Sequence, residues 1–145
     1  MADEATVTAG LSISVGGTLL HNTVDTITSD VSVANGPSPG AITVDEDGIN
    51  IDLSQLAVPG LCRIKNLDVP GDDNDNYVDV GLWDGAEFFP LMELRPGDAF
   101  VFRFSRNFGN TFANAPGTGT IADGIVLRLK AYNAECVVVI EAYDS

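Results

Sequence analysis

The chain has 145 residues, the size of one ordinary domain, and its formal net charge at pH 7 is −14. Apolar residues make up 45% and charged residues only 19%, a composition that excludes an intrinsically disordered chain. A surface with this much negative charge repels phosphate backbones and anionic lipid head groups, so we expect no direct binding to nucleic acid or membranes. The excess charge serves solubility or complements a basic partner, and solubility is the simpler interpretation.

The N-terminal residues predict two consecutive strands. Between residues 5 and 15, Ala, Val, Leu and Ile alternate with Thr, Gly and Ser. Gly16 and Gly17 then mark a turn, and a second strand is predicted over residues 18–27.

Short strands are predicted next at residues 31–33 and 42–44, separated by the strand-breaking segment NGPSPG. A further alternating run spans residues 49–53. Residues 1–58 contain no motif that assigns them a role, so this N-terminal part either folds onto its own domain or reaches a neighbour.

The second half of the chain continues the strand pattern. Predicted strands are LCRIKNLD, YVDVGLW, FFPLMEL, AFVFRFS, IVLRLKAY and CVVVIEAY, with a hairpin turn at Asp84-Gly85 and another turn at RPGD. No segment has sustained helical periodicity. Residues 1–145 therefore predict one all-β domain, an antiparallel β-sandwich resembling a jelly roll with about ten strands.

All 7 phenylalanines lie between residues 88 and 112. In AFVFRFS, Phe100, Phe102 and Phe104 share one face of a strand, as the inner face of a sandwich requires. Adjacent Phe88 and Phe89 point to opposite faces of their strand, so only one of them belongs to that layer. The aromatic strand is therefore predicted to belong to the core.

Residues 105–124 form a Gly-, Asn- and Thr-rich stretch without strand period, and loops of this length in compact domains are functional or disordered. Its aromatic rings either fold back over the open end of the domain or contact a partner. Aromatic and arginine side chains dominate interface energetics, so we expect a partner interface here. Its candidate residues are Arg106, Asn107, Phe108, Asn110 and Phe112.

Reactive side chains are few. His21 is the only histidine, and Cys62 and Cys136 do not form a Cys-x-x-Cys pair, so neither a catalytic base nor structural zinc is expected. The turn GDDNDN offers oxygens that suit calcium, from Asp72, Asn74 and Asn76 or from Asp73 and Asp75. It lacks the Gly and Glu of an EF-hand loop, so an acidic surface turn is the preferred interpretation. We expect no enzyme, no cofactor and no metal.

Both cysteines lie in apolar runs with strand character, which predicts buried free thiols. A disulfide between Cys62 and Cys136 is the alternative, because the two strands that carry them can be neighbours in a sheet. Trp83 directly precedes the Asp84-Gly85 turn and is predicted to be partly exposed.

Four segments, GLCRIKNLD, NYVDVGL, FFPLMELRPGDAF and AECVVVIEAY, resemble small β-rich proteins encoded among bacteriophage and prophage virion genes. The shared pattern is a strand ending in an Asn-Leu-Asp turn, a Val-x-Val-Gly strand, a Leu-x-Pro-Gly turn and a closing β-branched strand, and it covers residues 59–142. The chain departs from this pattern in its longer turn PGDDND and in its long loop at residues 105–124.

This resemblance implies a non-enzymatic virion protein, above all a capsid decoration (cement) protein that stabilises the assembled head, or else a tail or head-tail joining protein. It implies binding to the major capsid protein or other virion proteins and a homo-oligomer, with a trimer favoured. The protein would be made in the host bacterial cytoplasm and reside on the capsid surface. The competing hypothesis is a carbohydrate- or ligand-binding module that uses Trp83, Tyr77 and the turn GDDNDN.

Overall fold

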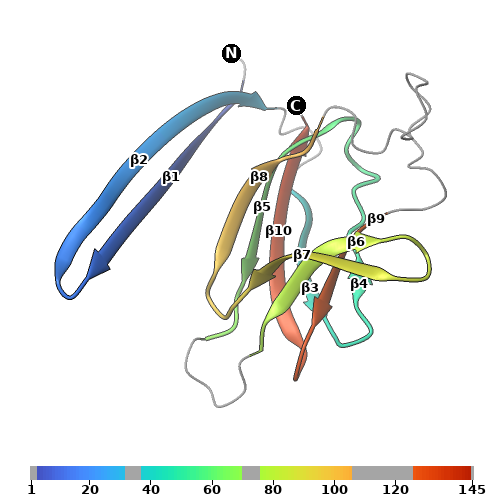
Figure 1. Ribbon diagram of the computed structural model, residues 1–145. Helices are drawn as coiled ribbons and strands as arrows, with labels where there is room; N and C mark the ends of the chain where they lie inside the picture. Colours follow the sequence, from blue (N-terminus) through green and yellow to red (C-terminus); the bar gives the residue numbers. More distant parts are fainter. Residues whose placement is uncertain (1–2, 32–36, 70–75, 106–125, 145) are drawn as a thin grey trace.

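The computed structural model of the chain describes residues 3–31, 37–69, 76–105 and 126–144 (Figure 1). All regular structure in these residues is strand, arranged in three antiparallel sheets, which confirms the all-β prediction. The strands are β1 (Asp3–Val15), β2 (Thr18–Val31), β3 (Ser38–Val44), β4 (Ile49–Asn50), β5 (Pro59–Asn66), β6 (Val78–Trp83), β7 (Phe88–Leu94), β8 (Ala99–Arg103), β9 (Val126–Ala131) and β10 (Cys136–Asp144).

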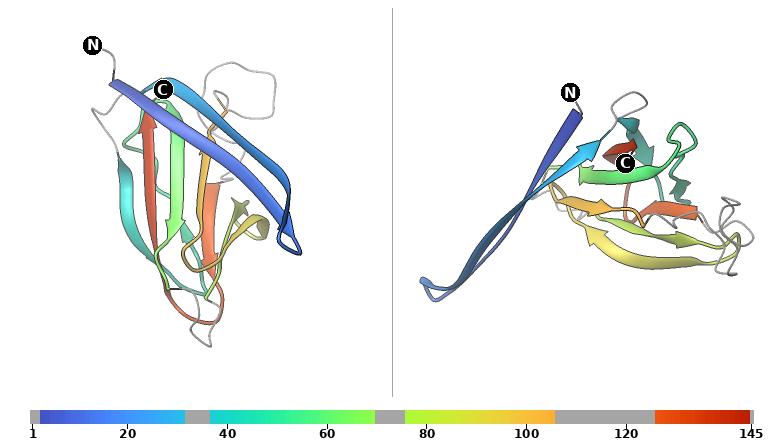
Figure 2. Two further views of the ribbon diagram at one scale, coloured as in Figure 1. Left: turned by 90° about the vertical axis from the view of Figure 1, so that its left-hand side faces the viewer. Right: turned by 90° about the horizontal axis from the view of Figure 1, so that it is seen from above.

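Within the part of the chain that the structure describes, β1 and β2 pair only with each other and form a hairpin, called the arm below. Gly16 and Gly17 both have positive φ, 57° and 80°, the backbone that a tight hairpin turn requires. The sequence predicted a break before residue 31, and that was wrong: β2 runs to Val31 because Thr28 and Asp30 continue the ladder opposite Thr6 and Glu4. The arm extends away from the rest of the molecule (Figures 1 and 2).

The other eight strands form two four-stranded sheets, called the body below. One sheet has the order β3-β10-β5-β8 and is named the β5 sheet; the other has the order β4-β9-β6-β7 and is named the β6 sheet. Alternate residues of β5, β9 and β10 are buried, as in β5, where Cys62, Ile64 and Asn66 point inward. These inward residues join one hydrophobic core drawn from both sheets, with Val44, Ile64, Val78, Val80, Leu129, Val138 and Ile140 at its centre.

The aromatic strand β8 lies at an edge of the β5 sheet, opposite β5. Its phenylalanines grade from core to surface: Phe104 is 5% exposed, Phe102 packs partly buried against the core, and Phe100 is 40% exposed. Their rings form a chain, with centroids 5.9 Å apart from Phe100 to Phe102 and 4.9 Å from Phe102 to Phe104. The core prediction is confirmed for Phe104 and Phe102, but Phe100 is exposed on β8, the strand that ends this sheet within the described residues.

Both cysteines are free and buried, as predicted. They lie on the neighbouring strands β5 and β10, but Cys62 faces Ala142 and not Cys136. The six-residue offset along β10 places the thiols about 20 Å apart, far beyond the reach of a disulfide. Burial raises the pKa of Cys62 to about 12, with a smaller contribution from the nearby carboxylate of Glu141.

Candidate functional site

The sequence-predicted interface residues Arg106, Asn107, Phe108, Asn110 and Phe112 lie outside the described residues, which stop at Ser105 and resume at Val126. The acidic turn at residues 71–76 is described only at Asn76. The arm and the outer faces of the two sheets are therefore the candidate sites that the structure places.

The arm has one apolar face. Because its strands pair in register, residues opposite each other point to the same side, and Ile27 lies opposite Val7. Leu11, Ile13 and Ile27 are 57%, 42% and 65% exposed. We call this face the apolar arm face after its β1 side: it consists of Ala5, Val7, Ala9, Leu11 and Ile13 of β1 and, opposite them on β2, Ser29, Ile27, Asp25, Thr23 and His21.

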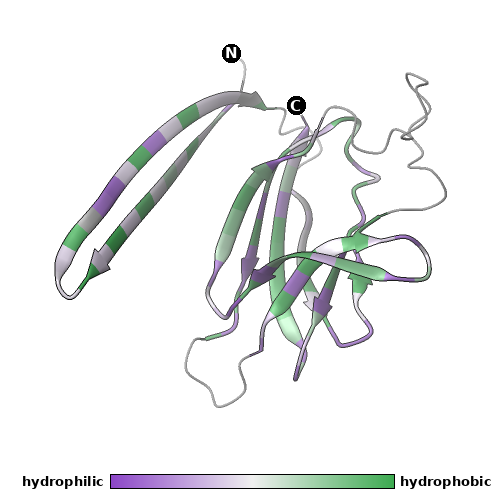
Figure 3. Cartoon of the chain, viewed as in Figure 1, coloured by the Kyte–Doolittle hydropathy of each residue, from purple (hydrophilic) through white to green (hydrophobic). Residues whose placement is uncertain are grey.

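The opposite arm face is polar apart from Gly10, Val24 and, beyond the register shift near the turn, Leu19 opposite Ser14. Thr6 lies opposite Thr28 and Thr8 opposite Thr26, with 3.4 Å between the two hydroxyl oxygens of the second pair. The alternation of apolar and polar residues is visible along both strands in Figure 3. A two-stranded hairpin is marginally stable in water by itself, so an arm with one exposed apolar face is the expected form of a segment that another surface covers.

The outer face of the β5 sheet is the second candidate surface. It is basic in an otherwise acidic protein, because Arg63, Lys65 and Arg103 project from it and are three of the chain's 7 Lys and Arg residues. Apolar side chains lie on the same face, of which Val101 and Val137 are 40% and 41% exposed. This basic face consists of Leu61, Arg63 and Lys65 of β5, Val101 and Arg103 of β8, and Val137, Val139 and Glu141 of β10.

Two contacts organise the basic face. Glu141 pairs with Arg63 at 2.5 Å, which offsets one of the three positive charges. Arg103 donates a hydrogen bond to the Ser29 hydroxyl and so holds the base of the arm beside the edge strand β8.

The outer face of the β6 sheet carries aromatic side chains. Tyr77 and Tyr132 stack with ring centroids 4.8 Å apart and planes 11° from parallel, and the ammonium of Lys130 lies 5.5 Å from the Tyr132 ring centre. Partial burial, and then the Glu93 carboxylate, raise the pKa of the neighbouring Asp79. Burial, and then the charge of Asp79, raise the pKa of Tyr132.

Trp83 lies on the same face and is half-buried, in agreement with its predicted partial exposure. The Arg128 guanidinium lies 4.4 Å from the centre of its ring. Arg128 also donates to Asn50 Oδ1 at 2.7 Å and to the Asp47 carbonyl at 2.6 Å. One side of the indole is therefore already occupied by a side chain that is itself held in place.

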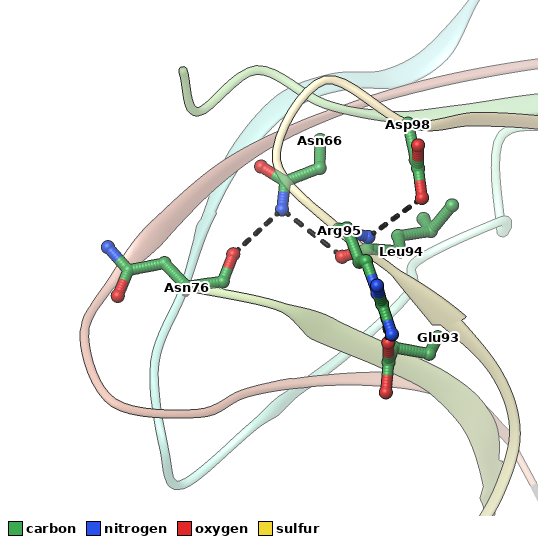
Figure 4. Close-up of polar contacts among 6 residues, drawn as sticks. All are labelled: Asn66, Asn76, Glu93, Leu94, Arg95 and Asp98. Carbon is green, nitrogen blue, oxygen red and sulfur yellow. Dashed lines mark hydrogen bonds and ion pairs between the residues drawn. The ribbon is translucent and has the colours of Figure 1, made fainter. Parts of the chain in front are cut away.

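The motifs that carry the virion resemblance meet at one structural junction, built around the fully buried Asn66 (Figure 4). Asn66 Nδ2 donates to the carbonyls of Asn76 at 3.1 Å and Leu94 at 3.3 Å, while its Oδ1 accepts from the Asp68 amide at 3.0 Å. Backbone bonds from Asn66 N to the Asp98 carbonyl and from Gly97 N to the Asn66 carbonyl tie in the RPGD turn. The Asn-Leu-Asp and Leu-x-Pro-Gly segments thus stabilise the fold at this point.

Within the parts of the chain that the structure describes, no three His, Cys, Asp or Glu side chains are grouped so that they would hold a metal ion. The same residues contain no helix of the length and apolarity needed to cross a membrane. Comparison of the chain with protein-family models, with curated proteins and with solved structures finds no match.

Sequence reasoning identified the strands that carry these surfaces but did not single out the apolar arm face or the basic face. Two signals were present in the sequence. Residues 1–62 contain no Lys or Arg, and Arg63 and Lys65 alternate with Cys62 and Ile64 along one strand.

Proposed function

We propose that this protein is a non-enzymatic structural component of a bacteriophage virion, most specifically a decoration protein that binds the assembled head. The observation that carries the proposal is the arm, a long hairpin that projects from a well-packed body. Six large apolar residues of the arm are exposed: Leu11, Ile13, Val15, Leu19, Val24 and Ile27. Segments of this kind bury their apolar surface in assemblies. The resemblance of residues 59–142 to virion proteins favours the virion as that assembly.

We further propose that the two sheets of the body form a β-sandwich of the jelly-roll type. The strand orders β3-β10-β5-β8 and β4-β9-β6-β7 support this, since consecutive strands alternate between the sheets except for the hairpin β6–β7. Jelly rolls occur in viral capsid proteins and in lectins, so the architecture is compatible with the proposed function without selecting it.

A decoration protein acts by binding the assembled shell and not its separate parts, which stabilises the shell by mass action. Its partners would be the major capsid protein and further copies of itself, with a trimer favoured because it matches local three-fold positions of a capsid lattice. The predicted loop interface at Arg106, Asn107, Phe108, Asn110 and Phe112 is one candidate contact with the shell.

The second candidate function is a carbohydrate-binding module, favoured by the aromatic outer face of the β6 sheet. Trp83 and the stacked pair Tyr77–Tyr132 supply flat rings, and Asp79 supplies a polar group beside them. The Arg128 side chain over Trp83 weakens this candidate, because a sugar on that side of the ring would have to displace a guanidinium that three oxygens already hold.

The experiment uses phage particles from a strain whose genome encodes this chain. We expect mass spectrometry to find the protein in purified particles. Heads assembled without it should bind the added purified protein in a sedimentation assay, and the bound heads should withstand heating better than bare heads. Absence from particles and failure to bind heads, combined with reproducible binding to a glycan array, would replace the proposal with the second candidate.

The loop is tested in the same assay. The double variant Phe108→Ala with Phe112→Ala should keep the thermal unfolding midpoint of the free protein and lose affinity for heads. A variant that loses stability and keeps its affinity would assign both rings to the protein's own fold.

A further inference from the structure

We propose that copies of this chain exchange arms: the apolar arm face of one copy packs on the basic face of the β5 sheet of a second copy. This inference rests on the proposed assembly function but concerns contacts between copies, and it requires no capsid protein.

The two surfaces match in apolar character. The apolar arm face presents Leu11, Ile13 and Ile27, and the basic face presents Val101 and Val137, all of them at least 40% exposed. A two-stranded ribbon laid on the outer face of a sheet is an ordinary packing of β-structure, with about 10 Å between the two layers.

The two surfaces also match in charge. The arm contains no Lys or Arg, and its apolar face includes Asp25, which lies opposite Ala9 in the register. The basic face presents Arg63, Lys65 and Arg103 with Glu141 as the only acidic residue at the outward positions of its described strands. In a protein of net charge −14, this is the sheet face on which an acidic ribbon meets the least repulsion.

The dimensions fit a whole sheet. The arm strands of 13 and 14 residues span about 40 Å. Neighbouring strands of a sheet lie about 4.8 Å apart, so the four strands of the β5 sheet span about 15 Å and a ribbon of that length crosses all of them.

The geometry of one copy directs the arm to a different copy. Arg103 fixes the base of the arm through Ser29 at the β8 edge, and from there the tip of the arm, at Gly16 and Gly17, extends away from the body (Figure 2). The donated surface and the receiving surface are different parts of the chain. The contact is therefore head-to-tail. In a closed ring such as a trimer, every arm packs on a neighbour and every basic face is covered by a neighbour's arm.

The test compares three versions of the full-length protein by analytical ultracentrifugation over a range of concentrations. The arm variant carries Leu11→Asp and Ile27→Asp, which place charges on the apolar arm face. The matched control carries Thr8→Asp and Thr26→Asp, which add the same charges to the same strands on the opposite face. The receiving-face variant carries Val101→Asp and Val137→Asp.

We expect the wild type to form an oligomer that dissociates on dilution and weakens at high salt. The arm variant and the receiving-face variant should each weaken association at least about 100-fold, since each removes two buried apolar contacts and adds two unpaired charges. The control should stay within about threefold of the wild type. Mixing the arm variant with the receiving-face variant should restore one contact per pair, giving a 1:1 complex that stops at two copies.

A wild type that stays monomeric at about 100 μM overturns the inference, and so does an oligomer that the arm variant leaves intact. If an aspartate variant does not keep the wild-type thermal unfolding midpoint, the pair Leu11→Ala with Ile27→Ala replaces it, with Thr8→Ala and Thr26→Ala as control. The two proposals fail separately. If the protein is a monomer that binds heads through the arm, arm exchange is overturned and the virion function stands. If it is an arm-dependent oligomer that is absent from particles, arm exchange stands and the virion function is overturned.

Discussion

The arm and the body use the same alternation of apolar and polar residues, yet their apolar residues have opposite surroundings. In the body, Ile64 and Val138 are fully buried because a second sheet packs against the first. In the arm, Leu11 and Ile27 are 57% and 65% exposed. Strand formation needs only the pattern and a pairing partner, whereas burial needs a second layer, and among the described residues only the body has that layer.

This difference separates two uses of apolar surface. Within the body, apolar burial contributes to the free energy of folding of one chain. On the arm, the same kind of side chain contributes only when another surface covers it. Paired substitutions, one in each region, therefore test the comparison directly, provided that the arm substitution lies on the polar arm face, away from the proposed contact.

The largest expected effect comes from the centre of the core. Ile64→Ala should lower the free energy of unfolding by about 2–5 kcal/mol, because it removes buried methyl groups and leaves a cavity. The matched arm change, Val24→Ala, removes a side chain that is 62% exposed and should stay within about 0.5 kcal/mol of the wild type. Chemical denaturation of dilute protein measures both, and equal effects would mean that the arm is packed like the body.

The next effect comes from the buried junction. Asn66→Ala removes the donor to the Asn76 and Leu94 carbonyls and the acceptor for the Asp68 amide, so we expect a loss of about 2–3 kcal/mol. Asn22→Ala, an exposed asparagine on the polar arm face, is the control and should change stability by less than about 0.5 kcal/mol. If Asn66→Ala were neutral, the junction would not stabilise the fold.

A glycine in each region gives a third pair. A Cβ on Gly81 would lie 2.2 Å from the Phe89 carbonyl oxygen and 2.8 Å from the Phe88 ring, so Gly81→Ala should cost about 1–3 kcal/mol through overpacking. A Cβ on Gly10 meets Val24 at 3.4 Å, close to ordinary contact, so Gly10→Ala should be neutral or slightly stabilising. Thermal unfolding of both variants checks the sign, and a harmless Gly81→Ala would show that β6 and β7 can separate.

The smallest effect concerns alkaline pH and belongs to the body alone, because the arm has no cysteine. Burial raises the pKa of Cys62 from 9.0 to about 12, so the folded state holds the thiol proton that the unfolded chain loses. Its contribution is complete below pH 9 and is lost as the pH rises from 9 towards 12. At pH 10 the expected loss is about 1.4 kcal/mol. Cys62→Ala should remove this part of the pH dependence, and an unchanged profile would contradict it.

Much of the fold could be predicted from local pattern. Alternation at residues 5–15, the Gly16-Gly17 turn and the Asp84-Gly85 turn each act over a few residues, so the sequence contains the information that they need. The burial of Phe104 and of both cysteines followed from the same alternation. The exposure of Phe100 did not, because Phe100 and the partly buried Phe102 share one face of β8, and alternation does not say how far along a strand the second layer reaches.

The candidate surfaces divide in the same way. The sequence by itself determined the faces of each strand, since side chains point alternately to either side of a strand whatever it pairs with. Only the tertiary structure decided which faces became core. It brought Asn66 beside Leu94, set Arg63, Lys65 and Arg103 on one sheet face, and left β1 and β2 outside both sheets of the body. These outcomes depend on contacts between residues far apart in the chain, whose free energy arises only when the sheets pack.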